Sequence, residues 1–252
     1  MTMTCDEKMI VAAHRGDSYN HYENTMGAFR AAIESGADMI ETDVRLTKDG
    51  LLVLSHEENI YKATGVQGRI GEMAYDDLRS LNFGGVDEVE QIPTLEEFMM
   101  LISKTNTLLN LEIKEMYSDG NEERCEKCVE MCVETVLRYH YQDKMVINCF
   151  DAHVLEYVSE KYPGIFQLHG FFPYTIMKNV NRNPDEYLYC ACIFDEKKEF
   201  FDYLISKGIE PWVGEKDTQL SRLKANYQMG ARAVTTNFPA DAIAKLQMIG
   251  AR

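Results

Sequence analysis

Basic residues are scarce in this 252-residue chain, which carries 26 Lys and Arg against 41 Asp and Glu and a formal net charge of -15. Such a surface repels phosphate polymers, so we expect no nucleic acid partner. No apolar run approaches the roughly 18 to 20 residues that a transmembrane helix needs, and the N-terminus lacks the pattern of a signal peptide. Seven cysteines, an odd number, do not suggest an obligatory disulfide framework. We therefore expect a cytoplasmic protein; its oligomeric state stays open.

Short apolar runs alternate with amphipathic stretches along the chain, the pattern of βαβ units and a parallel sheet. Eight runs are rich in β-branched or aromatic residues: 9–14, 38–44, 108–114, 145–150, 166–171, 188–194, 209–214 and 232–236. Helical periodicity marks the segments 24–34, 95–104, 122–140, 152–161, 196–207, 219–229 and 240–248. Eight strands with crossovers predict an α/β fold, a TIM (β/α)₈ barrel, as a single domain over residues 1–252.

One apolar run, residues 51–56, follows the second predicted strand after only four residues. A parallel crossover needs a dozen or more residues, so this run should form an antiparallel hairpin arm that carries His56 over the barrel mouth. The chain is then irregular and rich in glycine to about residue 92, with one short helical stretch near 76–81. We expect a small inserted lobe over about 51–92 that covers part of the site.

Three carboxylates are predicted to converge inside the barrel. Alternation along a strand puts Glu41 and Asp43 on one face at the carboxyl end of the second strand. The same alternation puts Asn110, Glu112 and Lys114 on one face of the third. Buried like charges must be neutralised, shift their pKa values or hold a cation. Three oxygen ligands without Cys suit one divalent cation, Mg²⁺ or Ca²⁺, better than Zn²⁺.

Two histidines are expected at the same end of the barrel. His14 and Arg15 end the first predicted strand, and Gly16 permits a sharp turn there. His56 supplies a second imidazole. Histidine moves protons near neutral pH, and guanidinium grips phosphate oxygens in bidentate fashion. With the carboxylates and Lys114, these residues fit phosphodiester cleavage, with one histidine as base and one as acid.

The segment AHRGDSYNHYENTMGAFRAAIESGADMIETDVRLTKDGLLVLSHEENI resembles the N-terminal signature of the glycerophosphodiester phosphodiesterases, with its HRG, ENT, E-x-D and second-histidine elements. IPTLEEF, LEIK and GARAVTTNFPADAIAKL are similar to further segments of that family. The resemblance covers almost the whole chain and implies a hydrolase of lipid and glycerol metabolism. Its expected substrate is a small glycerophosphodiester, cleaved to sn-glycerol 3-phosphate and an alcohol.

The resemblance also implies residue roles. Glu41, Asp43 and Glu112 are the implied metal ligands, and His14 and His56 the implied acid and base, in an order that the sequence leaves open. Arg15 and Lys114 hold the phosphate in this pattern. The glycerol 2-hydroxyl then attacks phosphorus and leaves a cyclic phosphate that water opens.

The chain departs from the family pattern in places. The family usually has Asp after its second histidine and Thr-Asp near the C-terminus, where this chain has Glu57 and Thr236-Asn237. The family's Leu-x-Arg-Thr-Thr is IYKATG here, and its Trp-Thr-Val-Asn is Trp-Val-Gly-Glu at 212–215. We expect these changes to affect recognition of the alcohol headgroup or the glycerol more than the class of reaction.

Two alternatives follow from the same residues. One is a lysophospholipase D or sphingomyelinase D-like phosphodiesterase, which an exposed apolar ridge beside the mouth would favour. The other is a non-catalytic glycerophosphate-binding module, which has no need of two proton-transfer groups.

Other notable residues have plainer interpretations. Trp212, the only tryptophan, ends a predicted strand and is expected to bind substrate as an apolar wall, with pure packing as the alternative. His169 also ends a strand and is a candidate to line the mouth. Cys125, Cys128 and Cys132 have helical spacing, which predicts core packing rather than a metal site.

Overall fold

Eight parallel strands form a closed ring at the centre of the computed structural model, which describes residues 8–86, 88–215 and 218–252. β1 pairs with β2 on one side and with β9 on the other, which closes the ring and confirms the predicted TIM barrel. The strands of the ring are β1 (Ile10–His14), β2 (Met39–Leu46), β4 (Leu108–Ile113), β5 (Met145–Asn148), β6 (Gln167–Phe172), β7 (Cys190–Ile193), β8 (Glu210–Glu215) and β9 (Ala233–Thr236). A ninth strand, β3 (Leu52–Leu54), pairs with β2 outside the ring.

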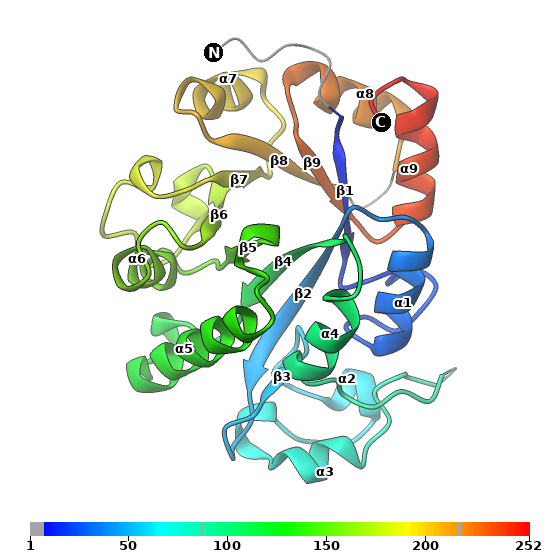
Figure 1. Ribbon diagram of the computed structural model, residues 1–252, viewed down its shortest axis with the longest axis vertical. Coiled ribbons are helices and arrows are strands. Elements are labelled where there is room, and N and C mark those ends of the chain that lie inside the picture. Colours follow the sequence, from blue (N-terminus) through cyan, green and yellow to red (C-terminus); the bar gives the residue numbers. More distant parts are fainter. Residues whose placement is uncertain (1–7, 87, 216–217) are drawn as a thin grey trace.

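Helices surround the ring (Figure 1). The longer ones are α1 (Met26–Glu34), α4 (Leu95–Ile102), α5 (Glu122–Arg138), α6 (Ala152–Lys161), α7 (Lys198–Ser206), α8 (Leu220–Met229) and α9 (Pro239–Met248), all as predicted to within a few residues. The sequence did not indicate α2 (Tyr61–Thr64) or the 3₁₀ helices η1 (Ile70–Glu72), η2 (Tyr117–Asp119), η3 (Gln142–Lys144), η4 (Tyr174–Ile176) and η5 (Pro184–Glu186). None of the described helices is long and apolar enough to cross a membrane.

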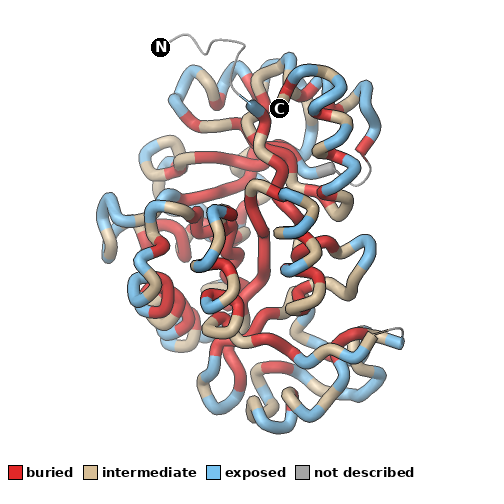
Figure 2. The backbone as a smooth tube through the Cα atoms, turned by 45° about the vertical axis from the view of Figure 1, so that its right-hand side comes forward, coloured by how far each residue is buried: buried red, intermediate tan, exposed pale blue. Residues whose placement is uncertain are grey.

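The barrel has an apolar floor and a polar mouth. The interior near the amino ends of the strands is filled by Ala12, Met39, Val146, Cys190, Trp212 and Ala233. Between the strands and the helices lies a larger core, to which α5 contributes Cys125, Cys128 and Cys132 as buried free thiols, as predicted. Figure 2 shows the buried strands running through the middle of the molecule, with exposed backbone on the outer helices and loops. Polar inward side chains are therefore left for the carboxyl ends of the strands.

The segment after β2 leaves the barrel repeat. β3 pairs antiparallel with β2, with Val53 beside Arg45, so the predicted hairpin arm is confirmed. The following chain, with α2 and α3 (Tyr75–Arg79), lies at the lower end of Figure 1. It packs around its own small apolar cluster of Val53, Ile60, Ile70, Leu78, Phe83 and Ile92. This packing holds the arm, and with it His56, against the barrel.

Candidate active site

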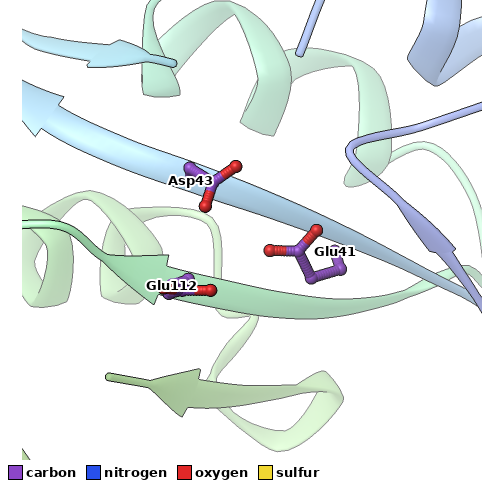
Figure 3. Close-up of side chains that lie close together, drawn as sticks. All are labelled: Glu41, Asp43 and Glu112. Carbon is purple, nitrogen blue, oxygen red and sulfur yellow. The ribbon is translucent and has the colours of Figure 1, made fainter. Parts of the chain in front are cut away.

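Glu41, Asp43 and Glu112 form a compact carboxylate cluster. All three are buried, and an oxygen from each lies within 4.8 Å of an oxygen from the others. Figure 3 shows Glu41 and Asp43 projecting from β2 and Glu112 from the neighbouring β4, with the carboxylates turned toward one another. The register explains the meeting, because Asp43 lies directly beside Glu112. The three predicted ligands are thus brought together.

Two cations balance part of this charge. Lys114 Nζ lies 3.0 Å from Asp43 Oδ1 and also contacts Glu112 Oε1, and Arg15 Nε lies 3.3 Å from Asp43 Oδ2. Burial and the neighbouring Asp43 and Glu112 nevertheless raise the pKa of Glu41 well above its usual range. Glu41 Oε1 is buried and accepts no hydrogen bond within the described residues, whereas Asp43 Oδ1 has the Lys114 ammonium beside it. A buried carboxylate oxygen without a donor, next to two further converging carboxylates, fits a hard divalent cation.

Asn24 orients the cluster, a role that the sequence did not reveal. Its side-chain amide donates to Asp43 Oδ2 (2.8 Å), and its carbonyl oxygen accepts from the Thr42 hydroxyl (2.7 Å). The residue has a φ of +56°, in the left-handed region where Asn is tolerated better than most residues. The side chain of the next residue, Thr25, caps α1 by accepting a hydrogen bond from Ala28 N. Thr25 therefore stabilises the helix, whereas Asn24 contacts the carboxylate cluster.

A sharp turn holds His14 and Arg15 above the cluster. Arg15 has a φ of +58° and Gly16 a φ of +83°, and a Cβ at Gly16 would lie 2.7 Å from the Ala28 backbone. This close approach explains the glycine. The Arg15 backbone N–H donates to Glu41 Oε2 (3.0 Å), and its guanidinium donates to Glu23 (2.9 Å). Arg15 is thereby fixed between Glu23 and Asp43.

Each histidine has a polar partner on its Nδ1 atom. His14 Nδ1 lies 2.6 Å from Asn237 Oδ1, and its Nε2 lies 3.9 Å from Glu41 Oε2. His56 Nδ1 lies 3.0 Å from Glu57 Oε1. Burial and the nearby Arg15 lower the pKa of His14, and burial and the nearby Lys114 lower the pKa of His56. Arg45 fixes the arm that carries His56 by donating to the His56 carbonyl (2.7 Å).

These partners add to one sequence-based expectation. Glu57 and Asn237 are the departures from the family pattern that we expected to affect substrate reading. In the structure they contact the two histidines directly. We therefore expect Glu57 and Asn237 to affect the two histidines as well as substrate recognition.

Both histidines open onto a cavity of about 640 Å³ at the carboxyl ends of the strands. Its polar lining includes His14, Arg15, Glu41, His56, Asn110, Glu112, Lys114, Asn148, His169, Arg222, Thr235 and Asn237. Its aromatic lining consists of Phe150, Phe171 and Phe194, which we call the aromatic rim. Phe150 and Phe171 stack with centroids 3.6 Å apart, and Phe194 is 57% exposed.

The expectation for Trp212 is wrong. Its side chain is 2% exposed, belongs to the apolar cluster in the lower barrel and does not line the cavity. The physical reason is that β8 continues to Glu215, so Trp212 lies in the middle of the strand rather than at its end. Its Nε1 donates to Glu210 (3.2 Å). The apolar wall is instead the aromatic rim, whose members follow β5 and β7 or lie within β6.

The contact between His14 and Asn237 gives a pH prediction. In Asn237→Asp, a carboxylate replaces the neutral amide and should stabilise the imidazolium form, which raises the pKa of His14. If His14 acts as the base, it must be deprotonated, so the acid limb of the kcat/KM profile should move to higher pH in the variant. The check is a kcat/KM profile of both proteins from pH 5 to 9, with thermal melts as a control. An acid limb that stays in place would contradict the role given to Asn237.

Comparison with known proteins points to one family. Residues 14–192 match the model of the glycerophosphoryl diester phosphodiesterase family. The chain is 37% identical over 164 residues to a glycerophosphodiester phosphodiesterase of Caldanaerobacter subterraneus subsp. tengcongensis, covering 63% of this chain and 65% of the relative. It is 27% identical over 267 residues to a human lysophospholipase D, covering 90% of this chain and 82% of the relative. The first alignment thus spans slightly less than two thirds of the relative's length.

Solved structures share the fold. An Oleispira antarctica phosphodiesterase in complex with the product sn-glycerol-3-phosphate superposes with a TM-score of 0.81 at 23% identity, covering 95% of this chain and 97% of that one. A glycerophosphodiester phosphodiesterase from Agrobacterium tumefaciens gives a TM-score of 0.77 at 18% identity, covering 94% of this chain and 99% of that one. At these identities the likeness supports the barrel architecture.

Proposed function

The chain belongs to the glycerophosphoryl diester phosphodiesterase family, and from this premise we propose that it hydrolyses glycerophosphodiesters to sn-glycerol 3-phosphate and an alcohol. The observation that carries the proposal is the arrangement of one cavity. His14 and His56 both face it, and so do Arg15, Lys114 and two members of the carboxylate cluster. A site for phosphoryl transfer needs proton donors and acceptors beside positive charge, and this cavity offers both.

Glu41, Asp43 and Glu112 are the residues that would hold a divalent cation, for which we propose Mg²⁺ or Ca²⁺. A bound divalent cation would supply positive charge against the phosphate oxygens. Arg15 and Lys114 bring two further cations to the same place, and we propose that they bind the phosphate. The guanidinium of Arg15 is held by Glu23 (2.9 Å) and so needs little reorganisation to do this.

The partners of the two histidines suggest their order of action. With Asn237 Oδ1 as acceptor, His14 carries its proton on Nδ1 and presents an Nε2 lone pair to the cavity, as a base requires. The Glu57 carboxylate beside His56 stabilises the protonated ring that an acid requires, against the burial and the Lys114 charge that lower the pKa of His56. We therefore assign His14 as the first base and His56 as the first acid.

The assignment gives a balanced reaction. His14 Nε2 takes the proton of the glycerol 2-hydroxyl as its oxygen bonds to phosphorus. The bond from phosphorus to the alcohol oxygen breaks, and His56 gives that oxygen a proton. His56 then takes a proton from water as the water oxygen bonds to phosphorus, the bond from phosphorus to the glycerol 2-oxygen breaks, and His14 returns a proton to that oxygen. Both histidines end as they began.

Release of glycerol 3-phosphate from a panel of glycerophosphodiesters tests the proposal. We expect no release in EDTA and restored release when Mg²⁺, Ca²⁺ or Mn²⁺ is added back, because the cluster should be inactive without its cation. Binding of the diesters without release under every metal would favour the binding-module alternative. Release that persists in EDTA would contradict the metal assignment.

A second candidate function is lysophospholipase D activity. The specific observation in its favour is the aromatic rim, since Phe194 is exposed beside the mouth and its ring centroid lies 5.7 Å from that of Phe171. An acyl chain could pack on such a surface. Release of the headgroup alcohol from monoacyl diesters, compared with the deacylated forms, separates the two candidates.

We also propose a cytoplasmic location. The described cysteines, Cys125, Cys128, Cys132, Cys149, Cys190 and Cys192, are buried free thiols. A reducing compartment suits such thiols.

A further inference from the structure

Two buried polar side chains in the cavity have no role in the proposed chemistry. Asn148 ends β5 and His169 lies within β6, and the two are 2% and 3% exposed. The register aligns Glu112 with Asn148 and Asn148 with His169, so they continue the polar row of the metal cluster around the barrel. Both line the cavity. They form what we call the polar recess.

Each residue of the polar recess has an atom without a hydrogen-bond partner. Asn148 Oδ1 and His169 Nε2 are buried and make no hydrogen bond within the described part of the chain. Asn110 Oδ1 lies 3.3 Å from His169 Nδ1, which places the proton on Nδ1 and leaves a lone pair on Nε2. Burial lowers the pKa of His169 to about 3, so the ring is neutral at ordinary pH.

The recess therefore presents two unpaired acceptor atoms and no formal charge, with the Asn148 amide nitrogen as a neutral donor. A buried acceptor that stays unpaired is costly, so these atoms favour a ligand with O–H donors. Phosphate and carboxylate oxygens have no proton to give to these two acceptors and would find no cation among the two residues of the recess. A neutral hydroxyl group is the chemical class that fits.

The order of product release indicates which hydroxyl group of the substrate binds in the polar recess. In the proposed reaction the alcohol leaves first, and the cyclic phosphate stays for the second step. The retained glycerol suits the buried recess, whereas the departing alcohol suits the open aromatic rim with its exposed Phe194. The glycerol 2-hydroxyl is the nucleophile, which leaves the terminal hydroxyl for the recess.

We propose that Asn148 and His169 bind the free terminal hydroxyl of the glycerol moiety and so select deacylated glycerophosphodiesters over monoacyl ones. The inference rests on the proposed function and names two specificity residues for it. An acyl ester at the terminal oxygen has no proton to donate to Nε2 or Oδ1. The polar recess thus disfavours the lysophospholipid that the aromatic rim alone would admit.

The test compares three substrates with the same ethanolamine leaving group. They are glycerophosphoethanolamine, its analogue with CH₃ in place of the terminal CH₂OH, and the 1-acyl form. All three keep the attacking 2-hydroxyl. We expect wild-type kcat/KM to fall about 10- to 100-fold on loss of the terminal hydroxyl, because the buried acceptors are then left unpaired. The 1-acyl form should be no better than the methyl analogue.

Variants of the polar recess show whether its two residues cause the preference for the terminal hydroxyl. His169→Phe and Asn148→Leu should slow glycerophosphoethanolamine but not the methyl analogue, which brings the ratio of the two kcat/KM values toward one. His153→Phe is the matched control, since that histidine stacks on Tyr117 at 4.1 Å, does not line this cavity, and should leave the ratio unchanged. Calorimetry adds a readout without turnover: sn-glycerol 3-phosphate should bind wild type about 10-fold or more tighter than 2-hydroxypropyl phosphate.

The outcomes separate this inference from the proposed function. Equal kcat/KM values for the first two substrates, or a preference for the 1-acyl form, would overturn the inference and leave the phosphodiesterase proposal standing; water alone would then occupy the recess. A second outcome is that no diester is turned over, while glycerol 3-phosphate still binds more tightly than 2-hydroxypropyl phosphate and His169→Phe abolishes that difference. This outcome would overturn the enzymatic proposal and keep the polar recess as a hydroxyl site. Equal affinities for sn-glycerol 3-phosphate and 2-hydroxypropyl phosphate would overturn the hydroxyl-binding role of the polar recess in either case.

Discussion

His56→Ala is expected to lower turnover of glycerophosphodiesters on the order of 100-fold or more, with fold and metal affinity nearly intact. The reason is the loss of the group that protonates the departing alcohol. His14→Ala should cost at least as much, because the 2-hydroxyl then lacks its base. Single-turnover rates with saturating metal, together with thermal melts, are the measurements. Normal turnover in both variants would refute the proton-transfer roles.

The leaving group distinguishes the two histidines. A p-nitrophenolate leaving group is a weak base and needs no proton, so His56→Ala should release p-nitrophenolate from a glycerol p-nitrophenyl diester almost as fast as wild type in a single turnover. His14→Ala should stay slow on the same diester, because the nucleophile still needs a base. The opposite pattern would exchange the two roles.

His21→Ala is the matched control for His56→Ala. His21 has a similar side-chain exposure, 32% against 29%, and its Nδ1 also contacts a single carboxylate, Glu88 at 2.7 Å. It does not line the cavity. Full activity in His21→Ala would show that loss of a partly exposed, ion-paired histidine does not by itself slow the enzyme.

The barrel could be predicted from the sequence because its signals are local. Each strand is a short apolar run beside an amphipathic helix, and the hairpin arm at 51–56 was evident from a connection too short for a crossover. Convergence of Glu41 with Asp43 followed from alternation along β2. Glu112 could be added because parallel strands bring their carboxyl ends to one edge of the barrel.

The contacts that tune the site could not be predicted in this way. Asn237 and His14 are 223 positions apart, and their pairing depends on closure of the barrel between β9 and β1. The support of Asp43 by Asn24 depends on a left-handed turn in a loop. Trp212 was misplaced because it was taken as the end of its strand, whereas it lies in the middle of β8 with its side chain in the apolar lower barrel. Loop conformation and strand ends carry weak local signals.

Glu41→Gln is expected to abolish metal binding while stabilising the metal-free protein. Gln has nearly the same shape but no negative charge, so the cluster loses one anionic ligand. Wild-type protein should melt about 5–10 °C higher at a metal concentration 100-fold above the dissociation constant. The variant should show no such rise with Mg²⁺ or Ca²⁺, and excess metal should not restore its turnover.

The rise in metal-free stability follows from the sign of the pKa shift. Burial and the carboxylates of Asp43 and Glu112 raise the pKa of Glu41 in the folded protein. A group with a raised folded pKa contributes stability below its unfolded pKa and loses it as pH rises through the folded pKa. Neutral pH lies above the unfolded pKa, so Glu41 destabilises the metal-free fold there, and Gln removes that cost. The stability difference between variant and wild type should grow as pH rises from 5 to 8.

Glu156→Gln is the matched control, with an expected effect of opposite sign. Glu156 is a buried carboxylate outside the cluster, and its Oε1 accepts hydrogen bonds from the backbone N–H groups of Asn181 (2.9 Å) and Arg182 (2.8 Å). Its replacement should lower stability and leave the metal-induced rise intact. If Glu41→Gln also lowered the metal-free melting temperature, or kept the metal-induced rise, the three carboxylates would be a structural ion-pair network with Lys114 and Arg15. Their convergence would then carry no argument for a cation.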